Sequence, residues 1–88
     1  MESKLDGNAA AGALQAIFPF EMTMAKATCT NCGAENVLGA VAAYMHGMGT
    51  VLRCPSCESV LMRVAHVKGR YWLDMRGLRA LQLGEAAE

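Results

Sequence analysis

The sequence predicts an α+β protein in which an N-terminal helix precedes a rubredoxin-like zinc ribbon of antiparallel strands. Three observations support this fold class. Four cysteines form two pairs, each with two residues between its members: Cys29/Cys32 and Cys54/Cys57. The stretch 9–18 is rich in alanine and carries leucine, and both residues favour helix. The stretch 59–67 is rich in β-branched and apolar residues, which favour strand.

The chain of 88 residues has the length of one small domain. We expect it to contain an N-terminal helical segment (1–20), the zinc ribbon (21–80) and a C-terminal tail (81–88). In the first part, Leu14 and Phe18 lie at helical spacing on one apolar face, and Pro19 ends the helix. So short a helix is marginal alone. We therefore expect it to dock on its own sheet or on another copy of the chain, as a homodimer.

Strands are expected at 22–28, 35–46, 50–53, 59–67 and 70–75. The second of these stretches lacks strict alternation and also fits a short helix, but we favour strand because hairpins must carry the cysteine pairs. Lys68-Gly69 has the composition of a turn, so 59–67 and 70–75 should pair as a hairpin. Residues 78–84 fit either a short helix or a final strand.

The spacing of the cysteines is typical of a tetrahedral zinc site. Two cysteines separated by two residues can both point at one ion when the backbone turns tightly between them. Gly33 follows the first pair, whereas Glu58 follows the second, so we expect the two turns to differ. The gap between the pairs, residues 33–53, is slightly longer than the usual range of about 15–20 residues. A loop or hairpin in the gap accommodates the extra length.

Other chemistries for the four cysteines remain open but are less favoured. Iron in a rubredoxin-like site uses the same ligands. Disulfides belong to oxidising compartments, and a thioredoxin-type motif needs a βαβ unit, which the sequence does not predict. Four thiolates complete a tetrahedron and leave no open position for a substrate. We therefore expect a structural Zn²⁺ held by Cys29, Cys32, Cys54 and Cys57, and no enzymatic activity.

The charge distribution suggests a second functional interpretation. The formal net charge is zero, but the basic residues concentrate in the second half of the chain. A nucleic-acid surface on strand face 63–79 would use the following residues: Arg53, Arg63, Lys68, Arg70, Trp72 and Arg76. Cations contact phosphates and aromatic side chains stack on bases. We favour a solvated face with Trp72 packed on the N-terminal helix, because the isoelectric point of 6.7 is below the value of about 9 that dedicated binders exceed.

The remaining composition favours a soluble binding protein. Apolar residues make up 53% of the chain, which is high for this length and suggests a surface that a partner covers. No signal peptide is recognisable, and no apolar run approaches the length of a membrane span. We therefore expect a cytoplasmic protein that does not contact membranes. Its predicted role is a protein-interaction or adaptor module with an unknown protein partner.

Four motifs together resemble a family of small bacterial proteins of unknown function that are predicted to be zinc ribbons. The motifs are Leu5-Asp6-Gly7-Asn8-Ala9, Cys29/Cys32 with Gly33, Leu52-Arg53-Cys54-Pro55 with Cys57, and Trp72-Leu73-Asp74-Met75-Arg76-Gly77. The resemblance covers nearly the whole chain. It implies a bacterial zinc-ribbon protein with the four cysteines as ligands, and it implies no activity.

Overall fold

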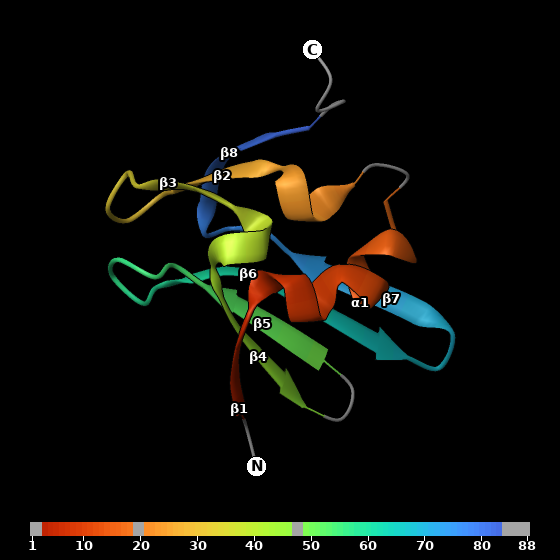
Figure 1. Cartoon of the computed structure of the whole chain (residues 1–88). Coiled ribbons are helices and arrows are strands. Elements are labelled where there is room, and N and C mark those ends of the chain that lie inside the picture. The colour runs from red at the N-terminus through yellow and green to blue at the C-terminus, as the bar shows by residue number, and fades with distance from the viewer. Residues whose placement is uncertain (1–2, 19–20, 47–48, 84–88) are drawn as a thin grey trace.

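The computed structural model describes residues 3–18, 21–46 and 49–83 (Figure 1). In these ranges the protein is all-β, with two antiparallel sheets and only short helical turns. The predicted α+β class, with an N-terminal helix before a ribbon, is therefore wrong. The strands are β1 (Ser3–Asp6), β2 (Lys26–Cys29), β3 (Glu35–Val37), β4 (Ala42–His46), β5 (Gly49–Arg53), β6 (Val60–Val67), β7 (Arg70–Asp74) and β8 (Leu78–Gln82). The helical turns are η1 (Gly7–Ala10), α1 (Ala11–Gln15), η2 (Met22–Met24) and η3 (Leu38–Ala40).

The two sheets form the two layers of the domain. One has five strands in the order β1-β4-β5-β6-β7, and the other has three in the order β3-β2-β8 (Figure 1). Alternating residues of β5 and β2 point into the space between the layers, as the burial of Leu52 and Ala27 shows. The largest fully buried side chains are those of Leu14, Met22, Cys29, Leu38, Val41, Leu52, Cys54 and Met62. The first cysteine of each pair thus belongs to the hydrophobic core.

The N-terminal segment forms a strand and two short turns in place of the expected helix. Residues 3–6 pair with β4 as an edge strand, and α1 covers only five residues. Gly7 lies so close to the Leu38 carbonyl that a Cβ atom would overlap it, so this packing of η1 on η3 requires glycine. Long-range pairing and close packing thus override the helix propensity of the alanines. Leu14 is only 1% exposed in the chain's own core, so this segment does not offer it to a second copy.

Two crossings between the sheets explain the other differences from the sequence prediction. The stretch 35–46 is not one strand, because η3 carries the chain from β3 in the small sheet to β4 in the large one. The chain returns through Gly77 to β8, which pairs with β2. The stretch 78–84 thus contains a strand, which includes residues 81 and 82 of the expected tail. Of the expected strand 22–28, only residues 26–28 are strand, as part of β2 (Lys26–Cys29).

The predicted hairpin between 59–67 and 70–75 is confirmed. β6 and β7 pair from Val67↔Arg70 to Arg63↔Asp74, and Lys68 and Gly69 form the turn with positive φ angles of 52° and 77°. Trp72 is 62% exposed, however, so the expected packing of Trp72 on an N-terminal helix is wrong. No helix within the described ranges is long and apolar enough to cross a membrane.

Candidate metal centre

The four cysteines come from two turns that belong to different sheets. We call residues 29–34, between β2 and β3, the first knuckle, and residues 54–59, between β5 and β6, the second knuckle. Both turns project on the same side of the molecule (Figure 1). Their four Sγ atoms lie within 4.8 Å of one another. The structure thus brings together every predicted metal ligand at the junction of the two layers.

Two of the distances between the sulfur atoms match the edges of a tetrahedral metal site. The Sγ atoms of Cys29 and Cys57 are 3.7 Å apart, as are those of Cys32 and Cys54. Four ligands at about 2.3 Å from a central zinc ion would be about 3.8 Å from one another. A disulfide would require about 2.05 Å, and all four cysteines are free. The residues therefore fit a closed four-thiolate metal site, and iron would fit the same ligands.

The two knuckles have the same backbone geometry, although the sequence suggested that they differ. In the first, the Cys29 N–H donates to the Ala34 carbonyl (2.9 Å), and the Gly33 N–H donates to the Cys29 carbonyl (3.0 Å). In the second, the Cys54 N–H donates to the Ser59 carbonyl (2.9 Å), and the Glu58 N–H donates to the Cys54 carbonyl (2.8 Å). Glu58 adopts φ = 67° where Gly33 has φ = 79°. Glu58 is therefore a non-glycine residue in a left-handed position.

This geometry predicts that Glu58→Gly stabilises the protein. The substitution removes the steric cost of a Cβ atom in the left-handed region, so the free energy of unfolding should rise by up to about 1 kcal/mol. Gly33→Ala is the matched control and should lower it by a similar amount, because no neighbouring atom lies within 4 Å of the added Cβ and only the conformation is penalised. Urea denaturation at a fixed free zinc concentration measures both. A destabilised Glu58→Gly variant would contradict the equivalence of the knuckles.

Hydrogen bonds to the sulfur atoms favour thiolates at part of the site. The side chains of Asn31 and Ser59 lower the pKa of Cys57 from 9.0 to about 6, and the Asn31 amide lies 3.4 Å from the sulfur. Burial opposes ionisation of Cys54, but the N–H groups of Cys57 and Ser56 bring its pKa below 9.0. Hydrogen-bond donors around a metal-binding sulfur generally lower the pKa of its thiol, because they stabilise the thiolate.

Cys32 shows why the cluster suits a cation. The Ala34 N–H favours its thiolate, but loss of hydration and hydrogen bonding to the sulfurs of Cys54, Cys57 and Cys29 raise its pKa to about 11. Several thiolates at this separation repel one another, so one thiol keeps its proton. A bound cation neutralises this repulsion and replaces the proton.

The structure also gathers most of the residues considered for nucleic-acid binding. Cross-strand pairing and alternation place four of them on the face of the five-stranded sheet that points away from the core, which we call the outer face: Arg53, Arg63, Arg70 and Trp72. Lys68 lies in the turn at the end of this face. Tyr44 was not predicted to take part, yet the Arg53 guanidinium lies 5.7 Å from the centre of its ring. Once the pairing of β4 with β5 is known, the alternation of side chains along β4 places Tyr44 on the outer face.

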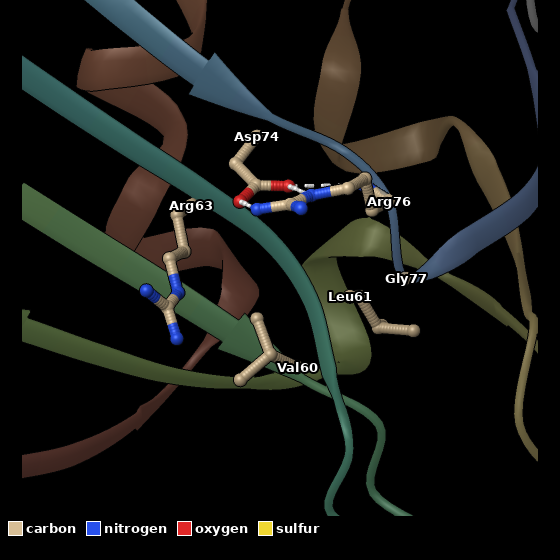
Figure 2. Close-up of a pocket in the computed structure, with 6 residues that line it drawn as sticks. All are labelled: Val60, Leu61, Arg63, Asp74, Arg76 and Gly77. Atoms are coloured by element: carbon tan, nitrogen blue, oxygen red, sulfur yellow. Dashed lines mark hydrogen bonds and ion pairs between the residues drawn. The ribbon is translucent and has the colours of Figure 1, made fainter.

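Arg76, the sixth residue considered, borders a pocket of about 180 Å³ beside the outer face. Arg63, Asp74 and Arg76 contribute its polar side chains, and Val60, Leu61 and Gly77 complete it (Figure 2). The Arg76 guanidinium donates to both carboxylate oxygens of Asp74, at 3.0 and 2.8 Å. These hydrogen bonds and that of the Arg76 backbone N–H lower the pKa of Asp74 from 3.8 to about 2. The pocket thus contains the ion pair between Arg76 and Asp74, and Arg63 contributes a second guanidinium to the lining of the pocket.

Comparison with known proteins places the chain in a family. A search of curated proteins finds no match, and a search of solved structures finds none either. The model of a family of unknown function, DUF6510, matches residues 1–86, a range that includes both cysteine pairs. The family description names neither a metal nor an activity. With almost its whole length matched, the chain belongs to the DUF6510 family of unknown function.

Proposed function

We propose that this protein is a small zinc-binding module in which one Zn²⁺, held by Cys29, Cys32, Cys54 and Cys57, has a structural role. The observation that supports this proposal is the pair of 3.7 Å distances between sulfur atoms, because they match the edges of a zinc–thiolate tetrahedron. The position of the site supports it as well. Each knuckle belongs to a different sheet, so an ion bound by both would tie the two layers together.

A binding role fits this site better than an enzymatic one. Catalytic zinc sites usually keep three protein ligands and a position for water, whereas four thiolates fill the coordination sphere. We therefore place the function of the protein on its surfaces, as a protein-interaction or adaptor module. The exposed apolar side chains of Tyr71, Trp72 and Leu73 support this assignment. The free cysteines suit a reducing compartment, so we assign the protein to the cytoplasm.

Metal analysis tests the first part of the proposal. Protein purified without added metal should contain about one zinc per chain, and the double variant Cys32→Ser/Cys57→Ser should contain none. Arg79→Ala, on the exposed surface of β8, is the control and should keep the full zinc content. Red protein that contains iron would instead indicate a rubredoxin-like electron-transfer site. Protein that contains no metal and retains the wild-type fold would contradict the proposal.

Nucleic-acid binding is a second candidate function, and the outer face is the observation that favours it. Three arginines and Trp72 share one sheet face there, with Tyr44 beside them. Proteins that bind single-stranded nucleic acids use this combination of cationic and aromatic side chains. A labelled single-stranded oligonucleotide should then shift in a gel, and the shift should weaken steeply with salt. Arg63→Ala should reduce binding, whereas Arg79→Ala, which removes the same charge from the other sheet, should not. Equal effects of the two variants would contradict a site on the outer face.

A further inference from the structure

β7 is an edge strand with exposed apolar side chains on both of its faces. It is the last strand in the order of the five-stranded sheet and, in the part of the chain that the structure describes, pairs with β6 alone (Figure 1). Tyr71 and Leu73 on one face are 42% and 41% exposed, and Trp72 on the other is 62% exposed. Edge strands are commonly protected by charged side chains, by proline or by a bulge. Arg70–Asp74 contains no proline, and its ladder with β6 has no register shift. Its two charged residues stand at opposite ends of the strand and have opposite signs, so an antiparallel copy can pair them.

The hairpin turn determines which backbone groups of β7 face outward. Lys68 and Gly69 form a two-residue turn with positive φ at both positions, and Val67↔Arg70 is the pair that closes it. The closing pair of such a hairpin exchanges hydrogen bonds, and hydrogen-bonded and non-hydrogen-bonded pairs then alternate along the ladder. Arg70, Trp72 and Asp74 therefore direct their N–H and C=O groups toward β6. Tyr71 and Leu73 direct theirs to the open edge.

We propose that β7 pairs antiparallel with β7 of a second copy, about a twofold axis at Trp72, so that the two large sheets become one. In this register Tyr71 lies opposite Leu73 of the second copy, and the two residues exchange both backbone hydrogen bonds. The same exchange occurs on the other side of the axis. All the outward N–H and C=O groups of Tyr71 and Leu73 are then satisfied. Trp72 meets its own copy in a non-hydrogen-bonded pair, where side chains approach most closely.

The charges of β7 identify a second copy as the occupant of this edge. In the register centred on Trp72, Arg70 lies opposite Asp74 of the second copy, and Asp74 lies opposite its Arg70. Asp74 accepts hydrogen bonds from Arg76 but has capacity for a further donor, and its side chain is 33% exposed. Centring the axis on Tyr71 or Leu73 would break both ion pairs and shorten the ladder. The five residues from Arg70 to Asp74 are thus complementary to themselves.

The proposed contact also closes after two copies. Pairing of one edge with the same edge of another copy uses the same surface twice, so no free β7 edge remains. Pairing of β7 with β1, the other edge of the sheet, would leave one edge free on each copy and produce filaments. Sedimentation of the purified, metal-loaded full chain should therefore show an equilibrium between monomer and dimer only.

A charge exchange tests this arrangement. Arg70→Asp places aspartate opposite Asp74 twice in a homodimer, and Asp74→Arg places arginine opposite Arg70 twice. Each variant alone should dimerise at least about tenfold more weakly than the wild type. A mixture of the two restores both opposite-charge pairs, so it should form a heterodimer of near wild-type affinity. Sedimentation with a fluorescent label on one variant measures this heterodimer.

Controls separate the contact from effects on folding. Arg79→Asp makes the same charge change on β8 and should leave dimerisation unchanged. The zinc content and circular dichroism of each variant should equal those of the wild type. A wild-type protein that stays monomeric at the highest attainable concentration would overturn the proposal. So would a mixture of the two variants that associates no more tightly than either alone. A monomer that binds single-stranded oligonucleotide through Trp72 would assign this surface to nucleic acid instead.

Discussion

Replacing Cys54 with serine is expected to unfold the protein. Cys54 is 1% exposed, and its sulfur lies 3.7 Å from that of Cys32 in the proposed metal site. Binding of a structural zinc ion contributes on the order of 10 kcal/mol, comparable with the total stability of a small domain. A serine hydroxyl does not replace a thiolate as a zinc ligand, so most of this free energy is lost. Far-UV circular dichroism and the dispersion of amide NMR signals at 25 °C measure the outcome.

Ser56→Ala is the matched control in the same knuckle. Ser56 contacts the Cys54 sulfur through its backbone N–H, at 3.4 Å, and the substitution leaves that group in place. This variant should remain folded. Removing the metal from the wild type with a strong chelator should reproduce the Cys54→Ser result, and added zinc should reverse it. A Cys54→Ser variant with wild-type spectra would contradict the structural role of the metal.

Gly77→Ala is expected to have the second-largest effect. A Cβ atom at this position would overlap the Val60 carbonyl oxygen and lie 2.7 Å from the Cα atom of Leu61, both backbone atoms of β6. The Gly77 carbonyl also accepts a hydrogen bond from the Thr30 N–H of the first knuckle, at 2.9 Å. An alanine at position 77 must therefore displace the backbone between the first knuckle and β6, the strand that follows the second knuckle. We expect a loss of about 3 kcal/mol in the free energy of unfolding.

Gly12→Ala provides the comparison for this variant. No neighbouring atom lies within 4 Å of a Cβ atom at Gly12, which belongs to α1. Alanine favours helix by about 1 kcal/mol over glycine, so this variant should be as stable as the wild type or more so. Urea denaturation at a fixed free zinc concentration measures both. If Gly77→Ala were no less stable than Gly12→Ala, the close contact with β6 would be disproved.

The sequence was most informative where structure depends on neighbouring residues. The cysteine spacing identified all four clustered thiols, and Lys68-Gly69 with its flanking alternation identified the β6–β7 hairpin. Alanine content misled the prediction for residues 9–18, because pairing of β1 with β4 and packing of Gly7 on Leu38 are long-range contacts. The irregular pattern of 35–46 was a usable sign that the chain leaves one sheet for the other at η3.

The surfaces required knowledge of the strand register. From the sequence, the basic residues between 53 and 76 had no known relation to one another. Pairing of β4 through β7 places Arg53, Arg63 and Trp72 on one face, and the edge position of β7 follows only from the strand order. Local propensity contains neither fact, because register depends on pairing between distant segments. Likewise, the left-handed conformation of Glu58 follows from its hydrogen bond to Cys54 and not from its residue type.

The pairing of β2 with β8 has a consequence for biosynthesis. β2 leads into the first knuckle and lies between β3 and β8, so its sheet contains both an early segment and the last strand of the described chain. While the protein is being translated, Cys29 and Cys32 leave the ribosome well before β8 has been made. The sheet that positions these two cysteines therefore becomes complete only once residues 78–82 have emerged as well. The three-stranded sheet that carries the first knuckle is thus completed only after the second knuckle has emerged.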